Sequence, residues 1–125
     1  MNLTIAVDAE RADELRSLDR ELVDVEELRG LVRRQAAPPR DGELGTLDEV
    51  LIVALGQGGA AGALTTALVA WLRRRVGSVT VRLTRSDSSV LEVNAQHVRN
   101  LSADKLMELT ARLQTELDSG RGTDR

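Results

Sequence analysis

Cysteine, phenylalanine and tyrosine are all absent from the 125 residues of this chain, and Trp71 is its only aromatic residue. The lack of cysteine excludes disulfides, thiolate nucleophiles and zinc–thiolate sites, and it fits a reducing compartment. A single aromatic ring argues against the stacking platforms that bind single-stranded nucleic acids. The hydrophobic core must therefore be aliphatic.

Positive charge is not in excess either. The chain carries 17 lysine and arginine residues against 20 aspartate and glutamate residues, and the two signs are interspersed. A nucleic-acid-binding domain usually has a strongly basic surface, so we expect no nucleic-acid partner. Lys105 is the only lysine, which excludes the phosphate loop G-x-x-x-x-G-K-[ST]. The N-terminal "MNLTIAVDAE" lacks the features of a signal peptide, and we expect a cytoplasmic protein.

Candidate catalytic groups are scarce. His97 is the only histidine, so neither a second histidine nor a cysteine completes a metal site around it, and we expect it at the end of a strand. The serines of "SDSS" (86–89) are explained by turn formation, and the carboxylates of Asp13 and Glu14 fall on the polar face of a helix. The sequence therefore predicts no enzyme, no cofactor and no metal site.

The length of the chain fits one compact domain. We place this domain at residues 1–118 and interpret residues 119–125 as a frayed tail.

Hydrophobic spacing predicts the elements of the N-terminal third. Alternation in "LTIAV" (3–7) predicts a strand, and apolar residues spaced by three or four positions predict a helix over 9–29 with a break near 23–24. Gly30 is typical of a helix C-terminus, and the following residues, 31–36, predict a second strand that precedes two prolines.

Two helices are predicted around a glycine cluster in the middle of the chain. Thr46 and Glu49 have the spacing of a capping box, which predicts a helix from Leu47 through "DEVLIVAL". A further helix is expected over 60–75, where three terminal arginines complement its dipole. The glycines that separate the two are Gly56, Gly58 and Gly59.

A hairpin is the clearest pattern in the C-terminal half. "SVTVRLTR" and "SVLEVNAQ" alternate on either side of the polar turn "SDSS". Val90 and Val93 do not share one parity, which indicates a bulge or a shifted register. The residues of the first strand that face one way are Val79, Val81 and Leu83.

Ser102 is expected to cap a final helix. The leucines that form its apolar stripe are Leu106, Leu109, Leu113 and Leu117. The resulting β-α-β-α-α-β-β-α order predicts an α+β domain with a four-stranded mixed sheet and helices packed on it.

The uncharged segment Val50–Leu72 has three readings. "GQGGAA" (56–61) fits the G-x-G-x-x-A pattern of a dinucleotide loop, but the following hairpin is not the parallel unit that such a loop requires. The segment is also long enough to span a membrane, although glycines, threonines and Gln57 dilute its hydrophobicity. In the third reading, which we favour, small residues allow close packing on the sheet or on another subunit.

So long an apolar element in so small a domain suggests surplus apolar surface, and hence self-association or a partner. The candidate interface residues are Gly58, Gly59, Ala60, Gly62, Ala63, Ala67, Trp71, Arg73, Arg74 and Arg75.

Several of these marks occur together in one known family. "RRQAAPP", "GELG", the glycine-alanine segment and "WLRRR" followed by "VTV" resemble the effector-associated constant component family, first type, of actinobacterial conflict systems. The similarity extends from the first strand to about Leu117. It implies a fixed adaptor that is encoded beside variable effectors, including peptidase-like proteins, and it transfers no binding residue to this chain.

The function predicted from the sequence is a non-enzymatic adaptor in a bacterial defence system. We expect it to bind an effector protein encoded nearby and copies of itself. The alternatives are a membrane-associated module acting through residues 50–72, and a small-molecule or nucleotide sensor using the glycine loop.

Overall fold

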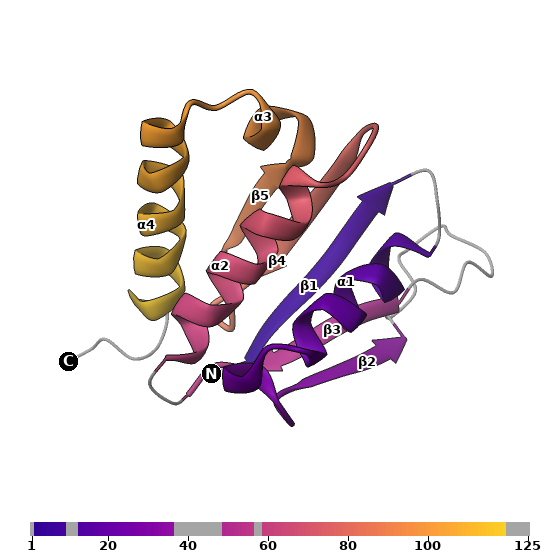
Figure 1. The fold of residues 1–125 in the computed structure, drawn as a ribbon. Helices are drawn as coiled ribbons and strands as arrows, with labels where there is room; N and C mark the ends of the chain where they lie inside the picture. The colour runs from indigo at the N-terminus through magenta and orange to yellow at the C-terminus, as the bar shows by residue number, and fades with distance from the viewer. Residues whose placement is uncertain (1, 10–12, 37–48, 57–58, 120–125) are drawn as a thin grey trace.

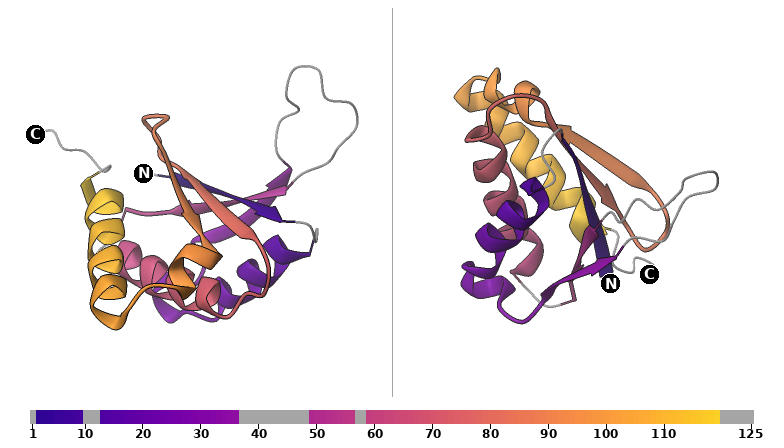
Figure 2. Two further views of the ribbon diagram at one scale, coloured as in Figure 1. Left: turned by 90° about the horizontal axis from the view of Figure 1, so that it is seen from above. Right: turned by 90° about the vertical axis from the view of Figure 1, so that its right-hand side faces the viewer.

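The computed structural model describes residues 2–9, 13–36, 49–56 and 59–119, which form a five-stranded sheet with helices on one face (Figure 1). Figure 2 shows that the described helices gather on one side of the sheet, and none of them covers its other face. The elements are β1 Asn2–Ala9, α1 Glu14–Val23, the 3-10 helix η1 Glu26–Leu28, β2 Val32–Ala36, β3 Glu49–Ala54, α2 Ala60–Arg73, β4 Val79–Thr84, β5 Val90–Asn94, α3 Ala95–Arg99 and α4 Ala103–Ser119.

The sheet has the order β2-β3-β1-β4-β5, and every pair of neighbours is antiparallel. It follows that β1 and β2 run parallel to each other with β3 between them, and that β3 and β4 run parallel with β1 between them. The helices α1 and α2 connect these two split pairs. This is the β-α-β-β-α-β arrangement of ferredoxin-like folds, extended by β5, α3 and α4. The predicted α+β class is confirmed.

The predicted four-stranded mixed sheet is wrong, because the segment expected to form a helix from Leu47 forms β3. Thr46 and Leu47 lie outside the described residues. A short continuous apolar run such as "VLIVA" fits a fully paired inner strand as well as a helix, and the β-branched Val50, Ile52 and Val53 favour the strand. Hydrogen bonding to both β1 and β2 stabilises this segment as a strand, which is the fifth strand of the sheet.

The predicted bulge or shifted register in the second hairpin strand is also wrong. β4 and β5 pair without interruption, with Val93 opposite Val81 and Val90 opposite Thr84. Val93 therefore faces the core, whereas Val90 is 49% exposed on the other face. The two valines differ in parity because only one of them is a core residue.

The predictions for the chain before β2 are largely confirmed. The predicted helix over 9–29 is interrupted near Val23 as expected: α1 ends there, and η1 forms a separate turn. Gly30 has a φ of +79°, a left-handed conformation that favours glycine. The helix begins later than predicted, at Glu14, and residues 10–12 lie outside the described part.

His97 is not at the end of a strand, because the chain turns directly from β5 into α3. The side chain of Asn94 accepts a hydrogen bond from the backbone N–H of His97 at 3.1 Å, which caps this short helix. His97 is consequently an exposed helical residue.

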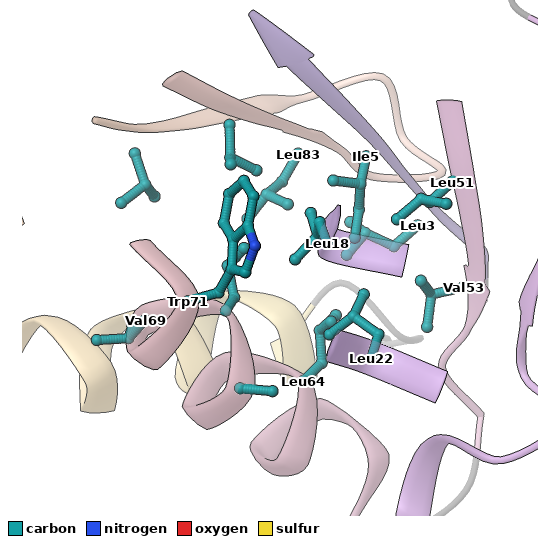
Figure 3. Close-up of a cluster of buried hydrophobic side chains, with 14 of the residues drawn as sticks. Leu3, Ile5, Leu18, Leu22, Leu51, Val53, Leu64, Val69, Trp71 and Leu83 are labelled. Atoms are coloured by element: carbon teal, nitrogen blue, oxygen red, sulfur yellow. The ribbon is translucent and has the colours of Figure 1, made fainter. Parts of the chain in front are cut away.

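The core lies between the sheet and the helical layer (Figure 3). Its hydrophobic side chains are aliphatic except for Trp71, as the composition requires. The fully buried Thr65 donates its hydroxyl to the carbonyl of Ala61 at 2.9 Å. Fully buried members from the strands and helices include Leu3, Ile5, Leu18, Leu22, Leu51, Leu64 and Leu83.

The final helix α4 packs on α2. Leu113 and Leu117 are buried, and Leu106 and Leu109 are partly buried against the core, which confirms the predicted stripe. Its start is capped as predicted, since Ser102 Oγ accepts a hydrogen bond from the N–H of Lys105 at 3.3 Å.

Candidate interaction surface around α2

The uncharged segment Val50–Leu72 does not form one helix. It is divided between β3 and α2, and α2 has 14 residues. No helix in the described ranges is both long enough and apolar enough to cross a membrane.

The start of α2 shows why a glycine precedes it. Gly59 occupies the N-cap position with a φ of +90°, and a Cβ atom built on it would have no neighbour within 4 Å. The expectation that Gly59 packs closely on the sheet is therefore wrong, and its left-handed backbone is what favours glycine. Close packing of Gly59 on another subunit stays a prediction. Gln57 and Gly58 lie outside the described residues.

The surroundings of this glycine loop do not form a dinucleotide-binding unit. Such a unit requires neighbouring parallel strands joined by the helix that follows the loop. Here α2 joins β3 to β4, and β1 lies between these two strands.

The other small residues of α2 bring it close to the rest of the chain. Ala60 and Ala67 are buried in the core, and Ala63 is partly buried against it. Gly62 faces α4, because a Cβ atom at this position would lie 3.0 Å from Nε2 of Gln114. Close approach of small residues is thus used between α2 and the other elements of this chain.

Trp71 is buried at the end of α2 that meets α1. Its side chain points into the core (Figure 3), and the residue is 1% exposed. The indole Nε1 donates a hydrogen bond to Ser17 Oγ of α1 at 3.1 Å, so the one polar atom of the ring is satisfied.

Arg75 connects the same two helices. Its guanidinium lies 4.9 Å from the centroid of the Trp71 ring, and its Nη1 donates to Glu14 Oε1 at 2.7 Å and to Ser17 Oγ at 3.0 Å. The backbone carbonyl of Arg75 accepts a hydrogen bond from Arg99 of α3. We call Glu14, Ser17, Trp71 and Arg75 the α1–α2 clamp.

The two remaining arginines of "WLRRR" are more exposed. Arg74 forms an ion pair with Glu21 of α1, with 2.6 Å between Nη2 and Oε1. Arg73 is exposed, and no ion pair involves it within the described part of the chain. Two of the three arginines are therefore paired with α1 in the chain itself, and Arg73 is the candidate whose charge is available to a partner.

Two features of the described ranges bear on possible chemistry. The described ranges hold no group of three histidine, cysteine or acidic side chains that could bind a metal ion. Hydrogen bonds from the side chain and backbone of Ser89 lower the pKa of Asp87, but this carboxylate lies in the exposed β4–β5 turn. These bonds explain "SDSS" as turn chemistry.

Two depressions of about 330 and 220 Å³ lie along α1. Both are lined mainly by charged side chains, whereas small-molecule sites are mostly apolar. Their composition does not support a small-molecule ligand. Their linings are Arg16, Asp19, Arg20, Arg34 and Glu49 for the larger, and Asp13, Glu14, Ser17, Arg20 and Arg75 for the smaller.

The strand predicted at residues 31–36 forms as β2, but its exposed position at the edge of the sheet was not predicted. Four of its five residues, Arg33 to Ala36, are exposed. The adjacent arginines are visible in the sequence, but their place at the sheet edge depends on β3, which was predicted to be a helix.

Fold and surface together define a small α+β domain in which one helical layer covers one face of an antiparallel sheet. Residues 7–114 match the family model Effector Associated Constant Component 1, and the chain belongs to this family. The resemblance seen in the sequence is confirmed, and the family consists of constant components of effector-associated conflict systems. Comparisons with curated proteins and with solved structures found no match.

Proposed function

We propose that this chain is a non-enzymatic adaptor that binds an effector protein of its own conflict system. The observation that supports this proposal is the family match over residues 7–114, because the family is described as effector-associated and constant. A constant component beside variable effectors requires a surface that the effectors share. Binding, not chemistry, is the activity that such an arrangement needs.

Partner contacts fall on surfaces other than the buried face of α2. Trp71, Ala60 and Ala67 are occupied by contacts within the chain, and the α1–α2 clamp uses the guanidinium of Arg75. Arg73 and the exposed strand β2 offer accessible polar groups.

Self-association stays a prediction. The argument for it, that the apolar segment Val50–Leu72 leaves surplus exposed surface, is weaker in the light of the structure. Most of the apolar surface of Val50–Leu72 is buried within the domain. Four large hydrophobic residues are exposed in the described ranges, each on a different segment of the chain. They are Val23, Val76, Val90 and Met107. Light scattering across a concentration series tests self-association directly.

The adaptor proposal can be tested by co-expressing the chain with the protein encoded beside its gene. We expect the two to co-elute in size-exclusion chromatography, and we expect the chain alone to show no hydrolytic activity. An effector from an unrelated system serves as the control. Separate elution of two folded proteins would contradict the proposal.

A further inference from the structure

We propose that the free edge of β2 is the docking site for an extended acidic segment of the effector, which would join the sheet as a sixth strand. This inference rests on the proposed function, because it describes how the effector is held. Addition of a strand to an exposed sheet edge is a common mode of peptide recognition.

The backbone of β2 determines which groups are available. Leu31 C=O accepts a hydrogen bond from the N–H of Ala54 at 2.9 Å, and the register continues with Val32 opposite Val53. Since hydrogen-bonded and non-hydrogen-bonded pairs alternate in an antiparallel ladder, Arg33 and Gln35 bond to β3. The N–H and C=O groups of Val32, Arg34 and Ala36 point away from β3.

These outward groups have no strand beside them in the described part of the chain, because β2 is the last strand of the sheet. Figure 1 shows β2 at the outer side of the sheet, next to β3. An added strand could therefore form hydrogen bonds without displacing any that exist within the sheet.

Charge indicates the chemistry of the added strand. Arg33 lies on the sheet face without helices among the described residues, and Arg34 lies on the helical face. The Nε of Arg34 is 3.3 Å from Asp19 Oδ2, and its Nη1 is 3.8 Å from Glu49 Oε1. The side chain of Arg34 is still 42% exposed, and Arg33 is exposed without an ion pair among the described residues. Two adjacent acidic residues in the added strand would point to opposite faces and could meet both arginines.

A second copy of the chain fits this edge less well. In the symmetric antiparallel pairing of two β2 strands centred on Arg34, that residue would lie opposite itself, and like charges opposite each other destabilise a pair. The arginines thus disfavour self-pairing in this register, and an acidic strand is the complementary occupant.

Two substitutions at one position separate side-chain from backbone effects. Arg34→Ala and Arg34→Pro both remove the guanidinium, but only proline also removes the outward N–H. Because this N–H does not bond to β3, proline is tolerated here as it is in other edge strands. Ala36→Pro, compared with the unmodified chain, applies the same logic without a change in charge, and circular dichroism verifies folding.

The probe is a short, fluorescent, β-prone peptide with two adjacent central glutamates, measured by anisotropy. We expect it to bind roughly three- to tenfold more tightly than the same peptide with two lysines, as two cross-strand ion pairs allow. Arg34→Ala should weaken binding, and Arg34→Pro should weaken it further. The inference would be overturned if the two Arg34 variants bound the peptide equally well and Ala36→Pro bound it as tightly as the unmodified chain. It would also be overturned if the unmodified chain bound the two peptides equally well.

Titration of the effector itself distinguishes this inference from the adaptor proposal. If the effector binds Arg34→Pro as tightly as Arg34→Ala, the edge is not its site, although the adaptor proposal stands. If the effector binds no form of the chain, the adaptor proposal fails, and the inference fails with it as stated. A larger assembly of the chain that disappears in Ala36→Pro would identify a second copy as the occupant and overturn the acidic-segment inference.

Discussion

Arg75→Met should destabilise the domain by about 2 kcal/mol, because it removes the cationic group of the α1–α2 clamp. The ion pair with Glu14 is mostly buried, with side chains that are 25% and 13% exposed. Removing one partner costs about 3–5 kcal/mol in a fully buried pair and about 0–1 kcal/mol in an exposed pair, so an intermediate value of about 2–3 is expected.

Two smaller effects act on this value in opposite directions. Loss of the cation–π contact with Trp71 adds about 0.5 kcal/mol. The Nε atom of Arg75 is buried without a hydrogen-bond partner among the described residues, so its removal should stabilise the domain by about 1 kcal/mol. The net expectation stays near 2 kcal/mol.

Arg74→Met is the matched control within the same motif. Its ion pair with Glu21 is equally short, but the side chains are 55% and 33% exposed. An exposed pair contributes about 0–1 kcal/mol, so this variant should be nearly neutral.

Equilibrium unfolding in urea measures both variants, and a double-mutant cycle of Arg75→Met with Glu14→Gln isolates the pair. The coupling energy should be at least about 1 kcal/mol. If both methionine variants lost the same small amount of stability, the clamp would not hold α1 to α2, and Arg75 would be as free for a partner as Arg73.

Gly59→Ala should lower the free energy of unfolding by about 1 kcal/mol, because alanine disfavours the left-handed backbone at this position. Gly62→Ala should leave stability unchanged or raise it slightly, because the higher helix propensity of alanine offsets a small shift of the exposed Gln114 side chain. Thermal unfolding compares the two variants. The pKa of the Asp87 carboxyl, measured by NMR titration, should lie below its ordinary value. Its contribution to stability is then fully present above the ordinary pKa and is lost as the pH falls through the lowered pKa. An unshifted pKa would contradict the hydrogen bonds from Ser89. In flotation with neutral liposomes the protein should remain in the unbound fraction, and co-flotation would instead favour the membrane-associated alternative.

The sequence predicted the elements whose signals are local. The alternation of β1 and β4, the stripe of α4 and the interruption of the first helix near Val23 each depend on residues close in the chain, and each is confirmed. The strand β3 could not be predicted in the same way. Its apolar run suits a helix or an inner strand, and the decision comes from β1 and β2, which are distant in sequence.

The site was harder to predict because its partners are far apart along the chain. Arg74 and Glu21 are separated by 53 residues, and Arg75 and Glu14 by 61. No spacing rule for a single helix reveals such pairs, so the arginines of "WLRRR" were predicted to be an interface. Whether any of the candidate interface residues contacts a partner stays a prediction, while their contacts within the chain are now defined.

Calorimetric titration of the purified effector into the purified chain tests the central claim most directly. The adaptor account predicts saturable binding at a fixed stoichiometry, with no binding of an effector from an unrelated system. The absence of any heat of binding at several temperatures, with both proteins folded and no complex on size-exclusion chromatography, would contradict it.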